Sequence, residues 1–64
     1  MGLNLKIARI RKGLSQNQLA EIVKVSPATI SKLECGKLNP RIDVVKRLAK
    51  ALDVSVSELI NDEQ

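Results

Sequence analysis

The chain has 64 residues, enough for one small domain that buries only about 60% of the surface of its unfolded chain. It contains no aromatic residue, which argues against proteins that bind single-stranded nucleic acid or RNA by stacking bases on aromatic rings. The net charge is +4, and residues 1–50 hold all eleven lysines and arginines but only three of the seven acidic residues, which favours a polyanionic partner.

The residues of an active site are also missing from the sequence. It has no histidine, no cluster of metal ligands, no glycine-rich phosphate loop and no nucleophile paired with a base, so we expect neither an enzyme nor a bound cofactor or metal. The single cysteine, Cys35, cannot form an intramolecular disulfide, and no apolar run approaches the roughly 20 residues that span a bilayer. We therefore expect one cytoplasmic domain, residues 1–64, without a membrane segment.

The spacing of the apolar residues predicts five helices and no strand. The first runs from Leu3 to Lys12 and ends at Gly13, and the residues expected on its core-facing stripe are Leu3, Ile7 and Ile10. The second opens at Ser15, where Gln18 three residues further on completes a capping box. Its expected buried residues are Leu19, Ile22 and Val23.

The third predicted helix runs from Ser26 to Glu34 and has a sharply defined start. Ser26 can accept a hydrogen bond from a free N–H of the first turn, and Pro27 suits the first helical position. Val25 is placed to pack against Ile30 from outside the cap, and Gly36 suits the left-handed residue that follows a helix.

The outer face of this third helix is small and nearly uncharged. If Ile30 points inward, Leu33 and Glu34 share its side, and the residues that point away are Ala28, Ser31, Lys32 and Cys35. A surface helix normally carries long charged side chains there, whereas short ones let the backbone approach another molecule closely. Such a face is typical of a helix that enters the major groove of DNA.

The last two predicted helices follow short loops. Asn39 is the expected cap of the fourth, next to Pro40, and its expected buried residues are Val45, Leu48, Ala49 and Leu52. Ser55 and Glu58 form a capping box for the fifth, which contains Leu59 and Ile60. Three residues near this end are open to two interpretations, as core or as part of a dimer seam: Val54, Val56 and Ile60.

A many-position pattern covers roughly Leu5 to Ile60, and it consists of Leu14-Ser15-Gln16, Leu19-Ala20, Val25-Ser26-Pro27, Ile30-Ser31, Leu33-Glu34, Gly36-Lys37, Pro40 and Ala49-Lys50-Ala51-Leu52. With this pattern the chain closely resembles the phage-repressor and Cro-like helix-turn-helix family, also called xenobiotic-response-element or lambda-repressor-like. The resemblance implies a compact, all-α, five-helix DNA-binding domain. It further implies a cytoplasmic transcriptional regulator, commonly a repressor, that binds a pseudo-palindromic operator in double-stranded DNA as a homodimer.

The resemblance also implies roles for single residues. Gln16 matches a residue that contacts a phosphate and braces the base-reading side chains. Pro27, Ala28 and Lys32 match the principal base-reading positions, flanked by Thr29 and Ser31. Pro27 and Ala28 replace the polar residues often found there, so they can touch a thymine methyl group but cannot hydrogen-bond a base, and polar readout falls mainly to Lys32.

Other matched positions lie outside the third helix. Lys37 and Arg41 fall where relatives grip the DNA backbone, although Arg41 replaces a common serine cap, which moves the expected cap to Asn39. Arg9 and Glu34 match a structural ion pair between the first helix and the end of the third. Lys24 stands where relatives often carry glycine, so a left-handed backbone there would be strained.

Two other functions remain open at this point. The same fold serves as a protein-interaction module, an antirepressor or adaptor, whose small outer face meets a protein. It also serves as the DNA-binding part of an antitoxin, which needs a further surface for its toxin, and 64 residues leave little room for one.

Overall fold

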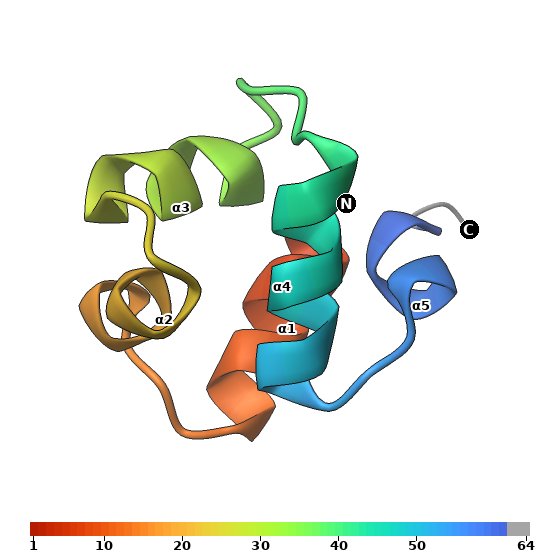
Figure 1. The fold of residues 1–64 in the computed structure, drawn as a ribbon, viewed down its shortest axis with the longest axis horizontal. Helices are drawn as coiled ribbons and strands as arrows, with labels where there is room; N and C mark the ends of the chain where they lie inside the picture. The colour runs from red at the N-terminus through yellow and green to blue at the C-terminus, as the bar shows by residue number, and fades with distance from the viewer. Residues whose placement is uncertain (62–64) are drawn as a thin grey trace.

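The computed structural model describes residues 1–61 and confirms five helices, with no strand in that part of the chain. In chain order they are α1 (Gly2–Arg11), α2 (Gln16–Val23), α3 (Pro27–Glu34), α4 (Ile42–Leu52) and α5 (Val56–Ile60). Figure 1 shows α4 upright in the centre with α1 behind it, α5 on one side, and the α2–α3 pair on the other. No helix in residues 1–61 combines the length and apolar character needed to cross a bilayer.

Three serines fix where helices begin. Ser15, Ser26 and Ser55 each have an extended backbone, and each side-chain oxygen accepts a hydrogen bond from the amide three residues further on. The two predicted capping boxes, Ser15 with Gln18 and Ser55 with Glu58, are both present. The predicted cap of the fourth helix is wrong: α4 has Arg41 as its N-cap, without a side-chain cap hydrogen bond, rather than Asn39.

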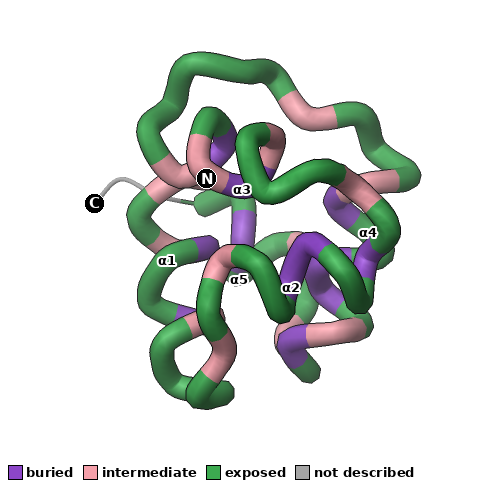
Figure 2. Tube along the Cα trace, turned by 90° about the vertical axis from the view of Figure 1, so that its left-hand side faces the viewer, coloured by how far each residue is buried: buried purple, intermediate pink, exposed green. Residues whose placement is uncertain are grey.

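The core is aliphatic, and Figure 2 shows its buried positions gathered where the helices meet. Its residues are Leu5, Ala8, Leu19, Ala20, Val23, Ile30, Leu33, Val45, Leu48, Ala49, Leu52 and Leu59. The predicted buried faces of α3 and α4 are confirmed by Ile30 and Leu33, and by all four α4 residues named above. Partly buried side chains complete the core, among them Val25, Val54 and Val56.

The predicted buried face of α1 is wrong, and that of α2 is wrong at one residue. The stripe Leu3, Ile7 and Ile10 points to solvent, and α1 instead buries Leu5 and Ala8. In α2, Leu19 and Val23 are buried as expected, but Ile22 is exposed and Ala20 takes its place. In both helices an alanine is among the buried residues, although the apolar spacing favoured larger aliphatic residues.

Candidate nucleic-acid interface

The start of α3 is held by a local hydrogen-bond network. The Ser26 hydroxyl accepts from the Thr29 amide at 3.2 Å, and the two hydroxyl oxygens of Ser26 and Thr29 lie 2.9 Å apart. Pro27 occupies the first helical position, where its missing N–H costs nothing. Thr29 is therefore half-buried and engaged with the cap. Its hydroxyl is less available to a ligand than the other side chains of the first turn.

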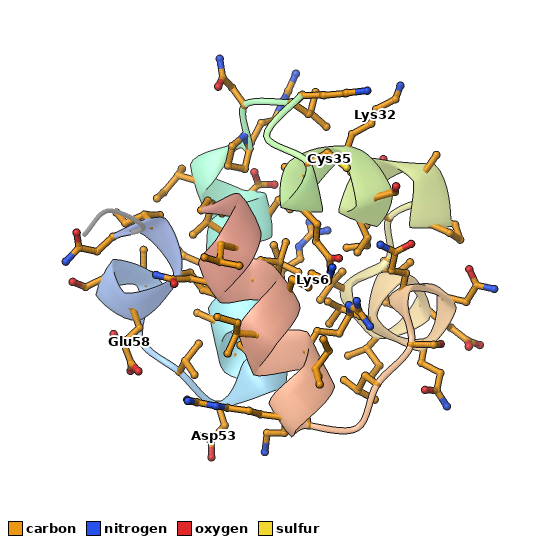
Figure 3. All side chains as sticks on the ribbon, turned by 180° about the vertical axis from the view of Figure 1, so that it is seen from behind. Lys6, Lys32, Cys35, Asp53 and Glu58 are labelled. Carbon is orange, nitrogen blue, oxygen red and sulfur yellow. The ribbon has the colours of Figure 1, made fainter. Side chains whose placement is uncertain are left out.

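The outer face of α3 is open. Pro27, Ala28 and Lys32 are exposed, and Ser31 is half-buried beside them. Figure 3 shows the Lys32 side chain extending beyond the edge of the molecule, with Cys35 one turn behind it. Three of the five α3 residues expected to touch DNA thus form a continuous surface with one flexible cation and little side-chain bulk.

An ion pair fixes the other end of α3. Arg9 Nε donates to Glu34 Oε2 at 2.6 Å and Arg9 Nη2 donates to Glu34 Oε1 at 3.2 Å, so the pairing is bidentate. Arg9 Nη1 donates to the carbonyl oxygen of Leu14 at 2.8 Å. The Glu34 side chain is 4% exposed and the Arg9 side chain 12%. This network ties α1 and the α1–α2 loop to the last turn of α3.

Gln16 joins the same network from the start of α2. Its Nε2 donates to Glu34 Oε1 at 3.0 Å, so the Glu34 carboxylate accepts hydrogen bonds from both Arg9 and Gln16. An amide nitrogen has two hydrogens, and the second one remains to donate to a ligand. Gln16 is half-buried, which places this donor at the rim beside α3 rather than on the outer face itself.

A close backbone contact that the sequence analysis missed involves Gly2. A Cβ atom built on Gly2 would lie 2.5 Å from the carbonyl oxygen of Glu34 and 3.1 Å from that of Leu33. Only glycine lets the first turn of α1 pack this tightly on the last turn of α3. The predicted first helix began at Leu3, so Gly2 lay outside it and no local signal in the sequence indicated this contact.

The loop between α3 and α4 carries the remaining predicted contacts. Lys37 and Arg41 are both exposed, and the loop that bears them rises beside the end of α3 in Figure 1. Because α4 has no side-chain cap, its first-turn amides have no side-chain acceptor. Asp43 lies in that turn and pairs with Arg47 at 3.7 Å, which partly neutralises its charge.

The turn between α2 and α3 is formed by a strained lysine. Lys24 has φ 62° and ψ 46°, the left-handed conformation, and its amide bonds the carbonyl of Ala20. The strain anticipated for a residue with a Cβ is therefore present in this turn. The turn sets the angle at which α3 leaves α2.

Comparison with known proteins agrees with this geometry. A family model described as helix-turn-helix (HTH_3) matches residues 5–59. The HTH-type transcriptional activator BcrR of Enterococcus faecalis is 39% identical over 66 aligned residues, which cover 100% of this chain and 32% of BcrR. The immunity repressor protein of Bacillus phage phi105 is 30% identical over 63 residues, 98% of this chain and 44% of the repressor. The chain thus spans less than half the length of these two relatives.

A solved structure matches over most of both chains. It is the restriction-modification controller protein C.AhdI from Aeromonas hydrophila, with a TM-score of 0.87 and 34% sequence identity. The match covers 92% of this chain and 89% of that one. The five-helix, helix-turn-helix fold implied by the sequence resemblance is confirmed.

Proposed function

The chain belongs to the helix-turn-helix (HTH_3) family of DNA-binding transcription regulators, and we propose that it binds double-stranded DNA sequence-specifically through the outer face of α3. We further propose that it acts as a repressor, and that it occupies a pseudo-palindromic operator as a dimer. Residues 1–64 act in this proposal as a single DNA-binding domain.

The observation that carries the proposal is the contrast between the two sides of α3. The inner side is fixed by Ile30, Leu33 and the buried Glu34 network, whereas the outer side presents Pro27, Ala28 and Lys32 to solvent. A recognition helix needs both properties, because base edges are read only when the helix is held at a fixed depth and angle.

Base readout in this proposal rests on few groups. Lys32 is the exposed cation of the helix, and a lysine in the major groove donates to the O6 and N7 acceptors of guanine. Pro27 and Ala28 are apolar and suit contact with a thymine methyl group. Ser31, half-buried at the edge of the face, is placed to hydrogen-bond a base edge or a phosphate.

Phosphate contacts would come from the rim of the same surface. Gln16 supplies one amide donor, and Lys37 and Arg41 supply charge on the far side of α3. The first turn of α4 adds backbone N–H groups that no side chain caps. Such contacts orient a protein on DNA without reading its sequence, and they make the affinity fall steeply with salt. Thr29 flanks the base-reading positions in this proposal, and its hydroxyl also contacts the Ser26 cap.

Repression is the regulatory outcome that needs the fewest contacts. A domain that covers a promoter blocks polymerase without any further contact, whereas activation requires a second surface aimed at polymerase. The related proteins bear names of both kinds, an activator and a phage immunity repressor. We propose repression because it needs only the surface already described.

Selection of bound duplexes from a random DNA pool tests this function. We expect an enriched pseudo-palindrome whose half-sites lie about one helical turn, roughly 34 Å, apart. Lys32→Ala should bind the same pool without recovering that sequence. A pool from which the wild-type chain enriches nothing at low ionic strength would refute the proposal.

A further inference from the structure

The side of α1 that faces solvent is apolar. Leu3 is 59% exposed, Ile7 39% and Ile10 57%. Leu3 and Ile7 are four positions apart, and Ile7 and Ile10 are three apart. All three therefore lie on one face of the helix, opposite the buried Leu5 and Ala8. We call them the α1 face. Contiguous apolar surface of this kind on a small domain marks an interaction site.

The α1 face carries more exposed apolar side chains than the surface near α5. Of the seven large hydrophobic side chains that are well exposed in residues 1–61, three belong to it. Near α5, the sequence allowed Val54, Val56 and Ile60 to belong either to the core or to a dimer seam. In the structure Val54 and Val56 pack against the core, and of these three only Ile60 is exposed, at 53%. An interface centred on α5 would therefore bury one large aliphatic side chain, compared with three for α1.

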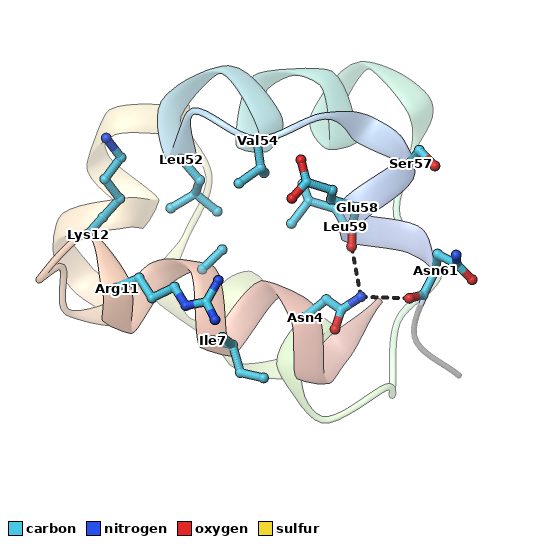
Figure 4. Close-up of a pocket in the computed structure, with 11 residues that line it drawn as sticks. Asn4, Ile7, Arg11, Lys12, Leu52, Val54, Ser57, Glu58, Leu59 and Asn61 are labelled. Atoms are coloured by element: carbon cyan, nitrogen blue, oxygen red, sulfur yellow. Dashed lines mark hydrogen bonds between the residues drawn. The ribbon is translucent and has the colours of Figure 1, made fainter. Parts of the chain in front are cut away.

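A groove of about 640 Å³ runs beside the α1 face, between α1 and α5 (Figure 4). Ile7 belongs to both surfaces, and Val54, Leu52 and Leu59 form the apolar floor. Asn4 holds the walls together, because its Nδ2 donates to the carbonyl oxygens of Glu58 and Asn61, each at 2.7 Å. These two hydrogen bonds tie α1 to the end of α5 across the groove.

The two ends of the groove carry opposite charge. Arg11 and Lys12 lie toward one end and Glu58 toward the other (Figure 4). Lys12 approaches Asp53 at 4.0 Å, whereas neither Arg11 nor Glu58 has an ion-pair partner within the described residues. A twofold axis perpendicular to α1 would reverse the helix direction between two copies. It would place the basic end of each groove against the acidic end of the other.

We propose that a second copy of this chain docks on the α1 face, with the two α1 helices antiparallel. Ile7 then meets Ile7 of the second copy, and Arg11 of each copy faces Glu58 of the other. Lys6 flanks the far edge, where its long side chain reaches water. This seam rests on the proposed operator-binding dimer and assigns its interface.

The recognition surface stays free in this dimer. Figure 3 shows α1 nearest the viewer, while Lys32 extends past the edge of the molecule in another direction. The docked copy therefore covers α1 and the groove beside α5, and it leaves the outer face of α3 open.

Sedimentation equilibrium on the free protein tests the seam with Leu3→Glu and Ile60→Glu, a matched pair at 59% and 53% exposure. The first turn of α1 contains no acidic residue, so a glutamate there favours the helix and the variant should fold. Because the twofold places each substitution in the interface twice, we expect Leu3→Glu to raise the dimer dissociation constant at least about tenfold through lost apolar contact, although the new carboxylate lies level with Arg11 of the second copy. Ile60→Glu should change it less than about threefold.

Charge removal tests whether the occupant is a second copy. Glu58→Gln keeps the oxygen that accepts from the Ser55 amide and removes the charge. Arg11→Gln and Glu58→Gln should each weaken the dimer, and the double variant should be no weaker than the worse single one. If the effects of Arg11→Gln and Glu58→Gln on the dimer dissociation constant are additive, the predicted contact between Arg11 and Glu58 of the two copies is wrong.

Any one of three results overturns the α1 seam. The wild-type chain could stay monomeric both free and on operator DNA, or the Leu3→Glu variant could dimerise as tightly as wild type. The third result is a dimer that Ile60→Glu disrupts and Leu3→Glu does not. Monomeric Leu3→Glu should still bind a duplex that carries one half-site. Loss of all DNA binding by wild type and folded variants would count against the proposed function, whereas persistence of the dimer in Leu3→Glu counts against the seam alone.

Discussion

Arg9 and Glu34 form a bidentate ion pair in which one carboxylate, 4% exposed, joins α1 to the end of the candidate recognition helix. Removing one member leaves the other charge poorly solvated. We expect Glu34→Ala to lower the free energy of unfolding by about 3 kcal/mol, measured by urea denaturation. The control is Asp43→Ala, which removes the exposed pair with Arg47 at 3.7 Å and should cost about 0.5 kcal/mol or less. Equal losses in the two variants would contradict a structural role for the Arg9–Glu34 pair.

Lys32 is expected to carry much of the sequence discrimination. Lys32→Ala should reduce the affinity gap between the selected duplex and a scrambled one by about 1 to 3 kcal/mol, because it removes a donor to a base edge. Lys50→Ala removes an exposed lysine from the last turn of α4 and leaves the gap unchanged. Fluorescence anisotropy titrations with both duplexes give the four affinities. If Lys32→Ala weakens binding to the two duplexes equally, Lys32 contacts the DNA backbone instead.

Lys24 offers a test of strain in the helix-turn-helix turn. Its backbone is left-handed, with φ 62°. This conformation has a steric cost for a residue with a Cβ atom, whereas glycine adopts it without that cost. Lys24→Gly should stabilise the domain by about 0.5 to 1 kcal/mol, observed as a higher melting temperature. Lys46→Gly, inside α4, should destabilise by a similar amount. If Lys24→Gly lowers the melting temperature as Lys46→Gly does, the backbone at Lys24 is not strained.

Gly2 should be sensitive to the smallest possible addition. A Cβ there would lie 2.5 Å from the carbonyl oxygen of Glu34, so Gly2→Ala must move α1 away from α3, at a cost of about 1 to 2 kcal/mol. Gly13→Ala is the contrast, since nothing lies within 4 Å of its Cβ and only its φ of +71° is unfavourable. Both variants should lose stability, but only Gly2→Ala should also weaken operator binding at a temperature where both are folded. Unchanged binding by Gly2→Ala would mean that this contact does not set the position of α3.

The parts of the fold with explicit local signals were predictable from sequence. Serine caps and the partners three residues later define the starts of α2, α3 and α5, and these interactions involve only neighbouring residues. The start of α4 lacked such a signal. Asn39 was the only capping side chain in reach, but the helix begins after Pro40, with Arg41 in the extended conformation at the cap.

The orientation of α1 was not predictable from apolar spacing alone, because two faces of that helix are apolar. The Arg9–Glu34 pair does decide between them. Arg9 lies close to Leu5 around the helix and far from Ile10, so a helix that directs Arg9 toward Glu34 also buries Leu5 and turns Ile10 outward. The expected inward stripe and the expected ion pair were therefore incompatible, and the ion pair was the better guide.

The positions of the site residues around α3 could be predicted once Ile30 was taken to point inward. The hydrogen-bond partners of the site residues could not be predicted in this way. Sequence spacing indicated neither that Gln16 donates to Glu34 nor that the Thr29 hydroxyl is engaged with Ser26. Both contacts join residues whose relative positions depend on how helices and side chains pack.

The central claim is that the outer face of α3 contacts DNA bases. Amide chemical-shift mapping of the labelled chain during titration with the selected duplex tests it most directly. We predict the largest shifts at residues 28–32, smaller ones around Lys37 and Arg41, and little change in the last turn of α4. Shifts confined to α1 and α5, or none at all at low ionic strength, would contradict the claim.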